Sequence, residues 1–264
     1  MSQLRKDARR AEVRAVGRLG FTELGRATRG IAAVHRLVSD GVFSGFARTP
    51  LRAWTQPSHR AHDAVAGGVY TAVASSLEVA ADIAGGLLDT PGRAPSATPR
   101  GAAMIGVLNG LIGDELEAAG SPLAPGMDVR VHGEPVAVST DALVRAFPDP
   151  TGHLVVFLHG LMETEHAWRR EARATYGRRL QSDLGATPIF VRYNTGRHIS
   201  DNGRDLSELL NRLVLLWPTP VTTLTLVGHS MGGLVIRSAC HAASESGAYW
   251  PEVLRHTVSL GTPH

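Results

Sequence analysis

The spacing of hydrophobic residues differs between the two halves of the chain, and the change lies near residue 125. In the first half they recur at steps of three and four, most clearly in the segment 65–87. That spacing is typical of one face of an amphipathic α-helix. The stripe consists of Val65, Val69, Val73, Leu77, Ala80, Ala84 and Leu87. Because Asp63, Glu78 and Asp82 interrupt it, the pattern predicts a soluble helix rather than a membrane-spanning one.

Residues 1–125 are expected to form a helical region. The basic segment 3–47 also has a helical pattern, and a further helix is predicted over Met104–Ala119. Stretches rich in proline and glycine at 90–100 and 118–127 act as a break and a linker between these segments. The sequence leaves open whether this region caps a site or docks onto another surface.

Residues 126–264 alternate between strand-like and helix-like patterns. A hairpin is predicted over 128–138, with its turn at Gly133-Glu134. Strand-like segments follow at 153–160, 186–194, 221–230 and 256–264, and helical patterns over Glu165–Leu180, Asp201–Leu216 and Met231–Ser246 lie between them. The runs LVVFL and LTLV are apolar without alternation, which is typical of strands covered on both faces. We therefore predict an α/β domain built on a mostly parallel sheet.

The composition indicates a globular chain. Hydrophobic residues make up 43% and charged residues 19% of the 264 residues, as in ordinary folded domains. The formal net charge is +3, and Lys6 is the only lysine among the cationic residues. Because no aromatic residues interleave with the arginines, we expect no nucleic-acid partner.

The sequence predicts neither a targeting segment nor a membrane span. The basic N-terminus lacks a continuous apolar core and a small-residue cleavage site, so we expect no signal peptide. The longest uncharged apolar stretches, 64–77 and 101–113, are shorter than the ~20 residues that cross a bilayer. We therefore expect a cytoplasmic protein; contact with a membrane surface stays open but is not predicted. The single cysteine, Cys240, is interpreted as a buried core thiol.

The segment LTLVGHSMGGLVIRS carries the chemistry that the sequence indicates most clearly. Gly228, Ser230 and Gly232 form a G-x-S-x-G pattern between an apolar strand-like run and a helical one. A sharp strand-to-helix turn of this kind lifts a serine above the carboxyl edge of a sheet, where it can act as a nucleophile. The alternative is a glycine-rich turn whose serine has no chemical role. The strand and helix on either side favour the nucleophile.

The two glycines and the following helix have separate physical roles. A side chain at Gly228 or Gly232 is expected to collide with neighbouring backbone in so tight a turn. The helix that begins at Met231 directs its free N–H groups, and the positive end of its dipole, at the site. The Met231 N–H is therefore a candidate donor to the oxyanion of an acyl-transfer reaction.

A second oxyanion donor is expected from the loop after the strand-like run HLVVFL. His159 and Gly160 follow that run, and the backbone N–H of Leu161 is our candidate. His159 is itself a candidate base, but we favour a role in shaping the turn by hydrogen bonding. His229, which lies inside the serine turn, is interpreted as a packing residue.

With these motifs the chain resembles the α/β-hydrolase superfamily, in its lipase and esterase branch near the GPI-inositol-deacylase-like hydrolases. The resemblance covers about residues 127–264 and rests on FLHGLMET, RYNTGRHISDNGRDLSELL, LTLVGHSMGGLVIRSA and SLGTPH. It implies a serine hydrolase that cleaves a small-molecule or lipid ester through an acyl-enzyme and needs no metal or cofactor. Ser230 carries over as the nucleophile, with Met231 and Leu161 as the backbone donors.

The other two members of a catalytic triad do not carry over. In the family the acid and the histidine follow the serine after later strands, and few residues follow Ser230 here, so we expect a chain truncated at its C-terminus. Glu163, Glu165 and Asp201 are interpreted as helix N-terminal residues rather than as the triad acid. His264 is interpreted as a neighbour of the site.

Three alternatives to an active serine hydrolase stay open. They are a catalytically incomplete fragment, a non-catalytic binding module on the same fold and, least favoured, a helical membrane-associated protein.

Overall fold

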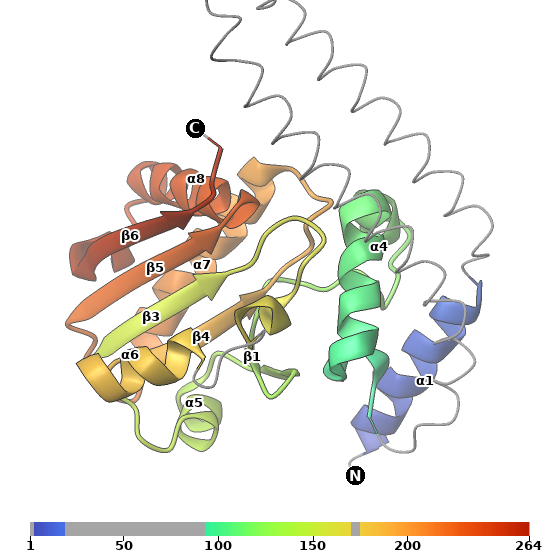
Figure 1. Cartoon of the computed structure of the whole chain (residues 1–264), viewed down its shortest axis with the longest axis horizontal. Helices are drawn as coiled ribbons and strands as arrows, with labels where there is room; N and C mark the ends of the chain where they lie inside the picture. The colour runs from blue at the N-terminus through green and yellow to red at the C-terminus, as the bar shows by residue number, and fades with distance from the viewer. Residues whose placement is uncertain (1–2, 19–92, 170–174, 264) are drawn as a thin grey trace, which may run out of the picture. The chain divides into compact units, whose positions relative to one another are not determined.

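The computed structural model describes residues 3–18, 93–169 and 175–263 of the chain (Figure 1). The first helix, α1 (Gln3–Arg18), lies in the basic segment that was predicted to be helical. The amphipathic helix predicted over 65–87 lies outside the described residues. None of the helices in the described part is both long and apolar enough to cross a membrane.

The chain forms two compact units, one of residues 1–12 and 92–264 and the other of residues 13–91. Helix α4 (Pro99–Ala118) lies in the first unit, together with the β-sheet. The boundary expected between residues 125 and 126 stays a prediction, as does the capping or docking role of the region before it.

A six-stranded sheet forms the centre of the first unit, in the order β2-β1-β4-β3-β5-β6. Strand β1 pairs antiparallel with both β2 and β4, whereas β4, β3, β5 and β6 are parallel to one another. The mostly parallel α/β sheet predicted from the sequence is therefore confirmed. The strands are β1 (Asp128–Val131), β2 (Glu134–Val136), β3 (His153–Leu158), β4 (Thr187–Arg192), β5 (Thr223–His229) and β6 (Leu254–Leu260).

Helices cover both faces of the sheet (Figure 1). Alternate residues of β3 show the two layers, because Leu154 and Val156 belong to one buried cluster and Val155 and Phe157 to another. The first cluster includes residues of α7 and α8, and the second packs against α6. Besides α1 and α4, the described α-helices are α5 (Thr140–Ala146), α6 (Tyr176–Leu184), α7 (Ile199–Leu216) and α8 (Met231–Ser246). The 3-10 helices are η1 (Pro95–Ala97), η2 (Glu165–Arg169) and η3 (Trp250–Val253).

Two predicted helices differ from the structure at their ends. The single helix predicted over Glu165–Leu180 is wrong, since η2 and α6 are separate elements and α6 begins only after Thr175, whose side chain accepts a hydrogen bond from the Arg178 N–H. Helix α4 begins five residues earlier than expected. Thr98 caps it by accepting the Gly101 N–H at 3.1 Å, and proline occupies its first position.

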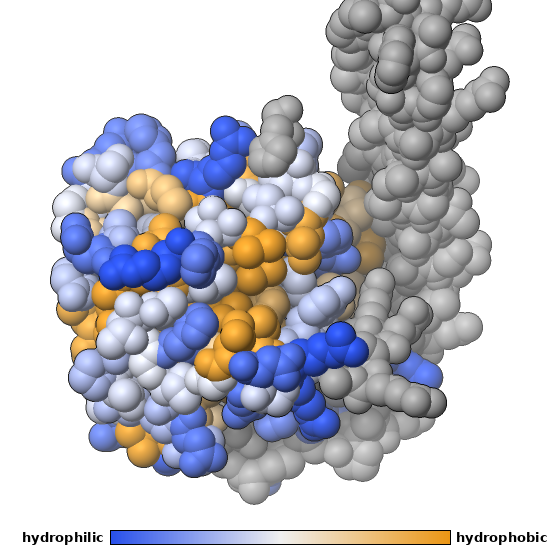
Figure 2. All heavy atoms as spheres, turned by 60° about the vertical axis from the view of Figure 1, so that its left-hand side comes forward, coloured by the Kyte–Doolittle hydropathy of each residue, from blue (hydrophilic) through white to orange (hydrophobic). Residues whose placement is uncertain are grey.

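Strand β6 forms an edge of the sheet. Its side chains from Arg255 to Leu260 are exposed, including Val258 at 41% and Leu260 at 39%. Figure 2 turns this side of the view forward and shows hydrophobic residues gathered on it among polar ones. This face of the described residues therefore presents apolar surface around the strand.

Candidate active site

Ser230 occupies a strained turn between a strand and a helix. Strand β5 ends at His229, helix α8 begins at Met231, and Ser230 between them has φ 50° and ψ −119°. A positive φ is costly for a residue with a Cβ, and such strain is common at functional positions. The structure therefore places Ser230 in the sharp strand-to-helix turn that its sequence context predicts.

The glycines on either side of Ser230 sit where a side chain would meet backbone. A Cβ at Gly228 would lie 2.5 Å from the nitrogen of Gly233, and one at Gly232 would lie 2.6 Å from the carbonyl oxygen of Leu158. Both distances are shorter than van der Waals contact, so the turn accepts only glycine at the two positions without a backbone shift. The carbonyl of Leu158 belongs to β3, so Gly232 also sets how closely α8 approaches that strand.

Backbone hydrogen bonds hold the turn at both of its ends. The Ser230 N–H donates to the carbonyl oxygen of Leu260 at 2.8 Å, and the Gly233 N–H donates to the carbonyl oxygen of Ser230 at 3.1 Å. The N–H groups of Met231 and Leu161 donate to no acceptor among the described residues. The Met231 N–H stands at the start of α8, where the helix dipole favours negative charge.

The loop after β3 contacts the serine turn. A Cβ at Gly160 would lie 3.2 Å from the Cβ of Ser230 and 3.0 Å from Nδ1 of His229. Leu161 follows Gly160, and its side chain is 46% exposed. The structure thus brings together the two segments from which the sequence predicted an oxyanion donor; the chemical roles of Leu161 and Met231 stay predictions.

Hydrogen bonds fix the direction of the Gly160–Leu161 peptide. The Gly160 carbonyl oxygen accepts from Nδ1 of His159 at 3.0 Å and from the Glu163 N–H at 3.2 Å. In a trans peptide the C=O and the following N–H point in opposite directions. Because the carbonyl is turned toward His159 and Glu163, the Leu161 N–H points in the opposite direction.

His159 shapes this loop rather than acting as a base. It is fully buried, and its Nε2 accepts the Tyr193 N–H at 3.4 Å while its Nδ1–H donates to Gly160. Its ring stacks on that of Tyr193 with centroids 4.5 Å apart, and the Tyr193 hydroxyl donates to the His159 carbonyl oxygen at 2.7 Å. Burial lowers the pKa of His159 to about 4. A neutral imidazole with both nitrogens engaged agrees with the turn-shaping role that we favoured.

Glu163 and His229 form a contact that the sequence interpretation did not include. Oε2 of Glu163 accepts the Gly160 N–H at 2.9 Å and lies 2.8 Å from Nδ1 of His229. Glu163 precedes η2 rather than lying in a helix, and His229 is hydrogen-bonded, not merely packed. The two residues lie 66 positions apart, so no local pattern pairs them.

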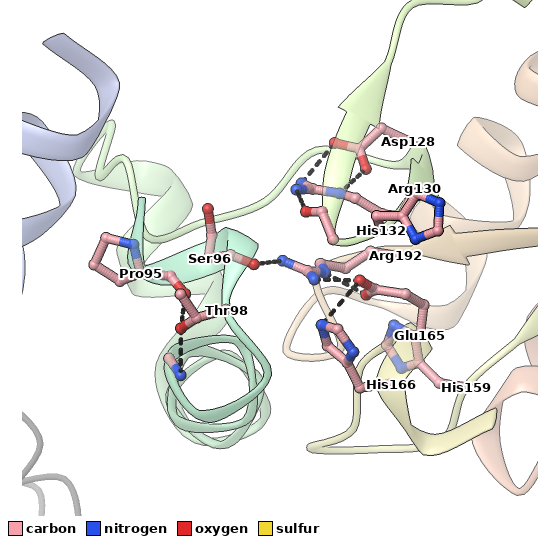
Figure 3. Close-up of polar contacts among 12 residues, drawn as sticks. Pro95, Ser96, Thr98, Asp128, Arg130, His132, His159, Glu165, His166 and Arg192 are labelled. Atoms are coloured by element: carbon pink, nitrogen blue, oxygen red, sulfur yellow. Dashed lines mark hydrogen bonds and ion pairs between the residues drawn. The ribbon is translucent and has the colours of Figure 1, made fainter. Parts of the chain in front are cut away.

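Glu165 forms a buried ion pair with Arg192, the last residue of β4 (Figure 3). Nε of Arg192 donates to one carboxylate oxygen at 2.6 Å and Nη2 to the other at 2.5 Å, while Nη1 donates to the Ser96 carbonyl at 2.7 Å. Burial raises the pKa of the Glu165 carboxyl, but the hydrogen bonds and charge of Arg192 outweigh it and leave the pKa below its ordinary value. Glu165 therefore has a structural role. Asp201 lies in the first turn of α7, as predicted, and pairs with Arg204.

Helix α4 supports the loop after β3 through glycines spaced along one of its faces. A Cβ at Gly106 would lie 3.0 Å from the carbonyl oxygens of Met162 and Glu163, and one at Gly110 would lie 2.2 Å from Cγ of Met162. One turn further on, the Gly113 carbonyl accepts the Asn194 side-chain N–H at 2.8 Å. The helix can approach the loop only because these positions lack side chains.

A cavity of about 510 Å³ opens beside the same loop. Its wall includes Met162 and Glu163 from the loop, together with Arg93 and His132. The cavity therefore adjoins the segment that carries Leu161.

No group of three or more potential metal-ligating side chains is found among the described residues.

The chain is similar to one domain family and to a lipase. Residues 149–264 match the PGAP1-like alpha/beta domain family. A triacylglycerol lipase of Burkholderia plantarii is 29% identical over 147 residues, which is 54% of this chain and 37% of the lipase. The chain thus matches little more than a third of the length of that relative.

Two solved structures of the Bacillus licheniformis lipase BlEst2 are also similar. The propeptide form is 26% identical over 44% of this chain and 24% of its own chain, and the mature form is 27% identical over 44% and 43%; each has a TM-score of 0.35. The described sheet, with helices on both faces, and the family match over residues 149–264 agree with each other. Residues 149–264 are therefore similar to the alpha/beta domains of that family, and the described sheet is of the mostly parallel kind expected for an alpha/beta-hydrolase of the lipase and esterase type.

Proposed function

We propose that the protein hydrolyses carboxylic esters, with Ser230 as the nucleophile. The observation that carries the proposal is the backbone of Ser230, held at φ 50° between β5 and α8 with Gly160 packed against it. A serine in this strained turn directs its hydroxyl toward solvent at the carboxyl edge of the sheet. The alpha/beta-hydrolase domain in which it lies supports the same chemistry.

The proposed reaction proceeds in two steps. Oγ of Ser230 attacks the ester carbonyl carbon and passes its proton to a general base, and the carbonyl oxygen becomes an oxyanion that the N–H groups of Leu161 and Met231 stabilise. The intermediate collapses, the C–O bond to the alcohol breaks, and the base returns its proton to the departing oxygen, so that a neutral alcohol leaves and an acyl-serine remains. Water then attacks the acyl-serine, which releases the carboxylic acid and restores the Ser230 hydroxyl.

The general base is not assigned to a residue. Among the described residues no histidine is hydrogen-bonded to the Ser230 hydroxyl, and the buried His159 has both ring nitrogens engaged. This observation favours, as a second candidate, a binding module that uses the same fold without catalysis. The two candidates differ in whether purified protein turns over an ester.

The substrate class that we propose is a small-molecule or lipid ester. The similar Burkholderia protein is a triacylglycerol lipase by name, which favours an acyl ester over a peptide or a phosphate ester. A series of p-nitrophenyl esters from acetate to palmitate would define the preferred length of the acyl chain.

The test uses the full-length protein with p-nitrophenyl butyrate. We expect turnover in the wild type, and we expect Ser230→Ala to reduce kcat by at least about 10³-fold, as losing a nucleophile does in serine hydrolases. Ser244→Ala is the matched control, because Ser244 lies on the same helix, is exposed and donates only to the His241 carbonyl. Turnover that survives in Ser230→Ala contradicts the proposal, and wild-type protein that binds esters without turnover favours the binding module.

A further inference from the structure

We propose that Glu163 is a positioning residue that holds the two oxyanion donors in register with each other. The inference rests on the proposed function, since it assigns Glu163 to the reaction at Ser230. It goes beyond that function because Glu163 touches neither the ester nor the nucleophile. It acts through the backbone of Gly160 and the side chain of His229.

The geometry depends on one atom. Oε2 of Glu163 accepts the Gly160 N–H at 2.9 Å and the His229 Nδ1–H at 2.8 Å. Gly160 immediately precedes Leu161, which carries the first proposed donor. His229 immediately precedes Ser230, and Met231 with the second donor comes next. A single carboxylate oxygen therefore ties the loop after β3 to the serine turn.

The surroundings keep this tie in place. The Glu163 side chain is 24% exposed and the His229 side chain 45% exposed, so the contact between them is partly shielded from water. The Glu163 backbone N–H also donates to the Gly160 carbonyl, so the loop from 160 to 163 is closed by two bonds. The Trp168 and His229 rings also meet in a T-shaped contact, with their centroids 6.4 Å apart.

The consequence for catalysis follows from where charge develops. An oxyanion forms only after Ser230 attacks, so donors that are misplaced by a fraction of an ångström weaken the transition state more than the bound ester. Losing a whole donor typically costs 10²–10³-fold in rate, and a misplaced one costs less. Removing the Glu163 carboxylate should therefore lower kcat by about 10- to 100-fold and leave KM within about 3-fold.

Variants at position 163 test this claim in the full-length protein with p-nitrophenyl butyrate. Glu163→Ala removes both hydrogen bonds. Glu163→Gln keeps one oxygen that can accept from both groups, so we expect it to recover most of the kcat that alanine loses. Glu163→Asp is one methylene shorter and cannot span the same gap, so its kcat should fall like that of alanine. The matched control is Glu245→Ala, which breaks an exposed glutamate–histidine pair with His241 on α8.

A double-mutant cycle separates a shared role from two independent ones. If Glu163 acts through His229, the variant carrying Glu163→Ala and His229→Ala loses no more kcat than the larger of the two single variants. Additive losses contradict the proposal. A rise in KM at unchanged kcat contradicts it too, because that pattern indicates ground-state binding.

Failure of this inference differs from failure of the proposed function. If Ser230→Ala abolishes turnover and Glu163→Ala behaves like Glu245→Ala, only the positioning role is wrong. If turnover survives in Ser230→Ala, the proposed function is wrong and the positioning role is wrong with it. Should Glu163→Ala fail to fold, as judged by its thermal melt, the comparison of the Asp and Gln variants decides: equal kcat values overturn the proposal.

Discussion

The backbone N–H of Ser230 donates to the carbonyl oxygen of Leu260 over 2.8 Å, which ties the serine turn to the last residue of β6. The same turn touches Gly160 on its other side. The φ of 50° at Ser230 is therefore held from two neighbouring strand ends, β3 and β6, and not by its own local sequence alone.

The first prediction concerns the close approach of α8 to β3. We expect Gly232→Ala to destabilise the protein by about 1–3 kcal/mol, because its new methyl group would overlap the backbone of β3. Gly126→Ala is the matched control, since Gly126 has open space around its Cβ position and should change stability by less than about 0.5 kcal/mol. Chemical denaturation measures both, and equal effects would rule out the tight turn.

The second prediction concerns the buried pair of Glu165 and Arg192. We expect Glu165→Ala to cost about 3–5 kcal/mol, because it leaves the Arg192 charge buried without its partner. Asp201→Ala removes the partner of Arg204 at the surface and should cost less than about 1 kcal/mol. The free energy of unfolding of the two variants, measured side by side, checks the difference. A small loss in Glu165→Ala would show that water reaches Arg192.

The third prediction concerns acid stability and His159. The pKa of His159 is about 4 in the folded protein and about 6.5 in an unfolded chain. Between these values the unfolded state binds more protons, so stability falls as the pH drops through this window, by about 3 kcal/mol in all. In His159→Gln this contribution is absent.

The check is the free energy of unfolding of wild type and His159→Gln measured from pH 7 to pH 4. Acid titration of carboxylates affects both proteins alike, so the difference between them isolates the histidine. The wild type should lose about 3 kcal/mol more than the variant over this range. Parallel curves would show that folding does not lower the pKa of His159.

Local sequence was enough to predict the strand-to-helix turn around Ser230. Gly228, Ser230 and Gly232 fall within five residues, and the apolar run before them and the helical run after them fix the geometry between. The strands of the parallel sheet were predictable for the same reason, since burial on both faces leaves an unbroken apolar run. The early start of α4 was not predicted, because it depends on a threonine cap that precedes the hydrophobic pattern.

Contacts between distant segments were not predictable from these patterns. Glu163 reads as an ordinary acid ahead of a helix, and only the fold brings it against His229. Arg192 looks like the polar end of a strand, yet it binds Glu165 and the carbonyl of Ser96, 96 residues away in sequence. Such pairs are fixed by the topology of the sheet and the packing of η1 and η2 on it. The spacing of hydrophobic residues along the sequence therefore does not predict them.

The identity of the nucleophile is the central claim, and covalent labelling tests it most directly. The full-length protein is treated with a fluorophosphonate probe, digested, and mapped by mass spectrometry. We predict a single modified residue, Ser230, with labelling that Ser230→Ala abolishes and Ser244→Ala leaves intact. A probe adduct on any other residue, or undiminished labelling of Ser230→Ala, would contradict the claim.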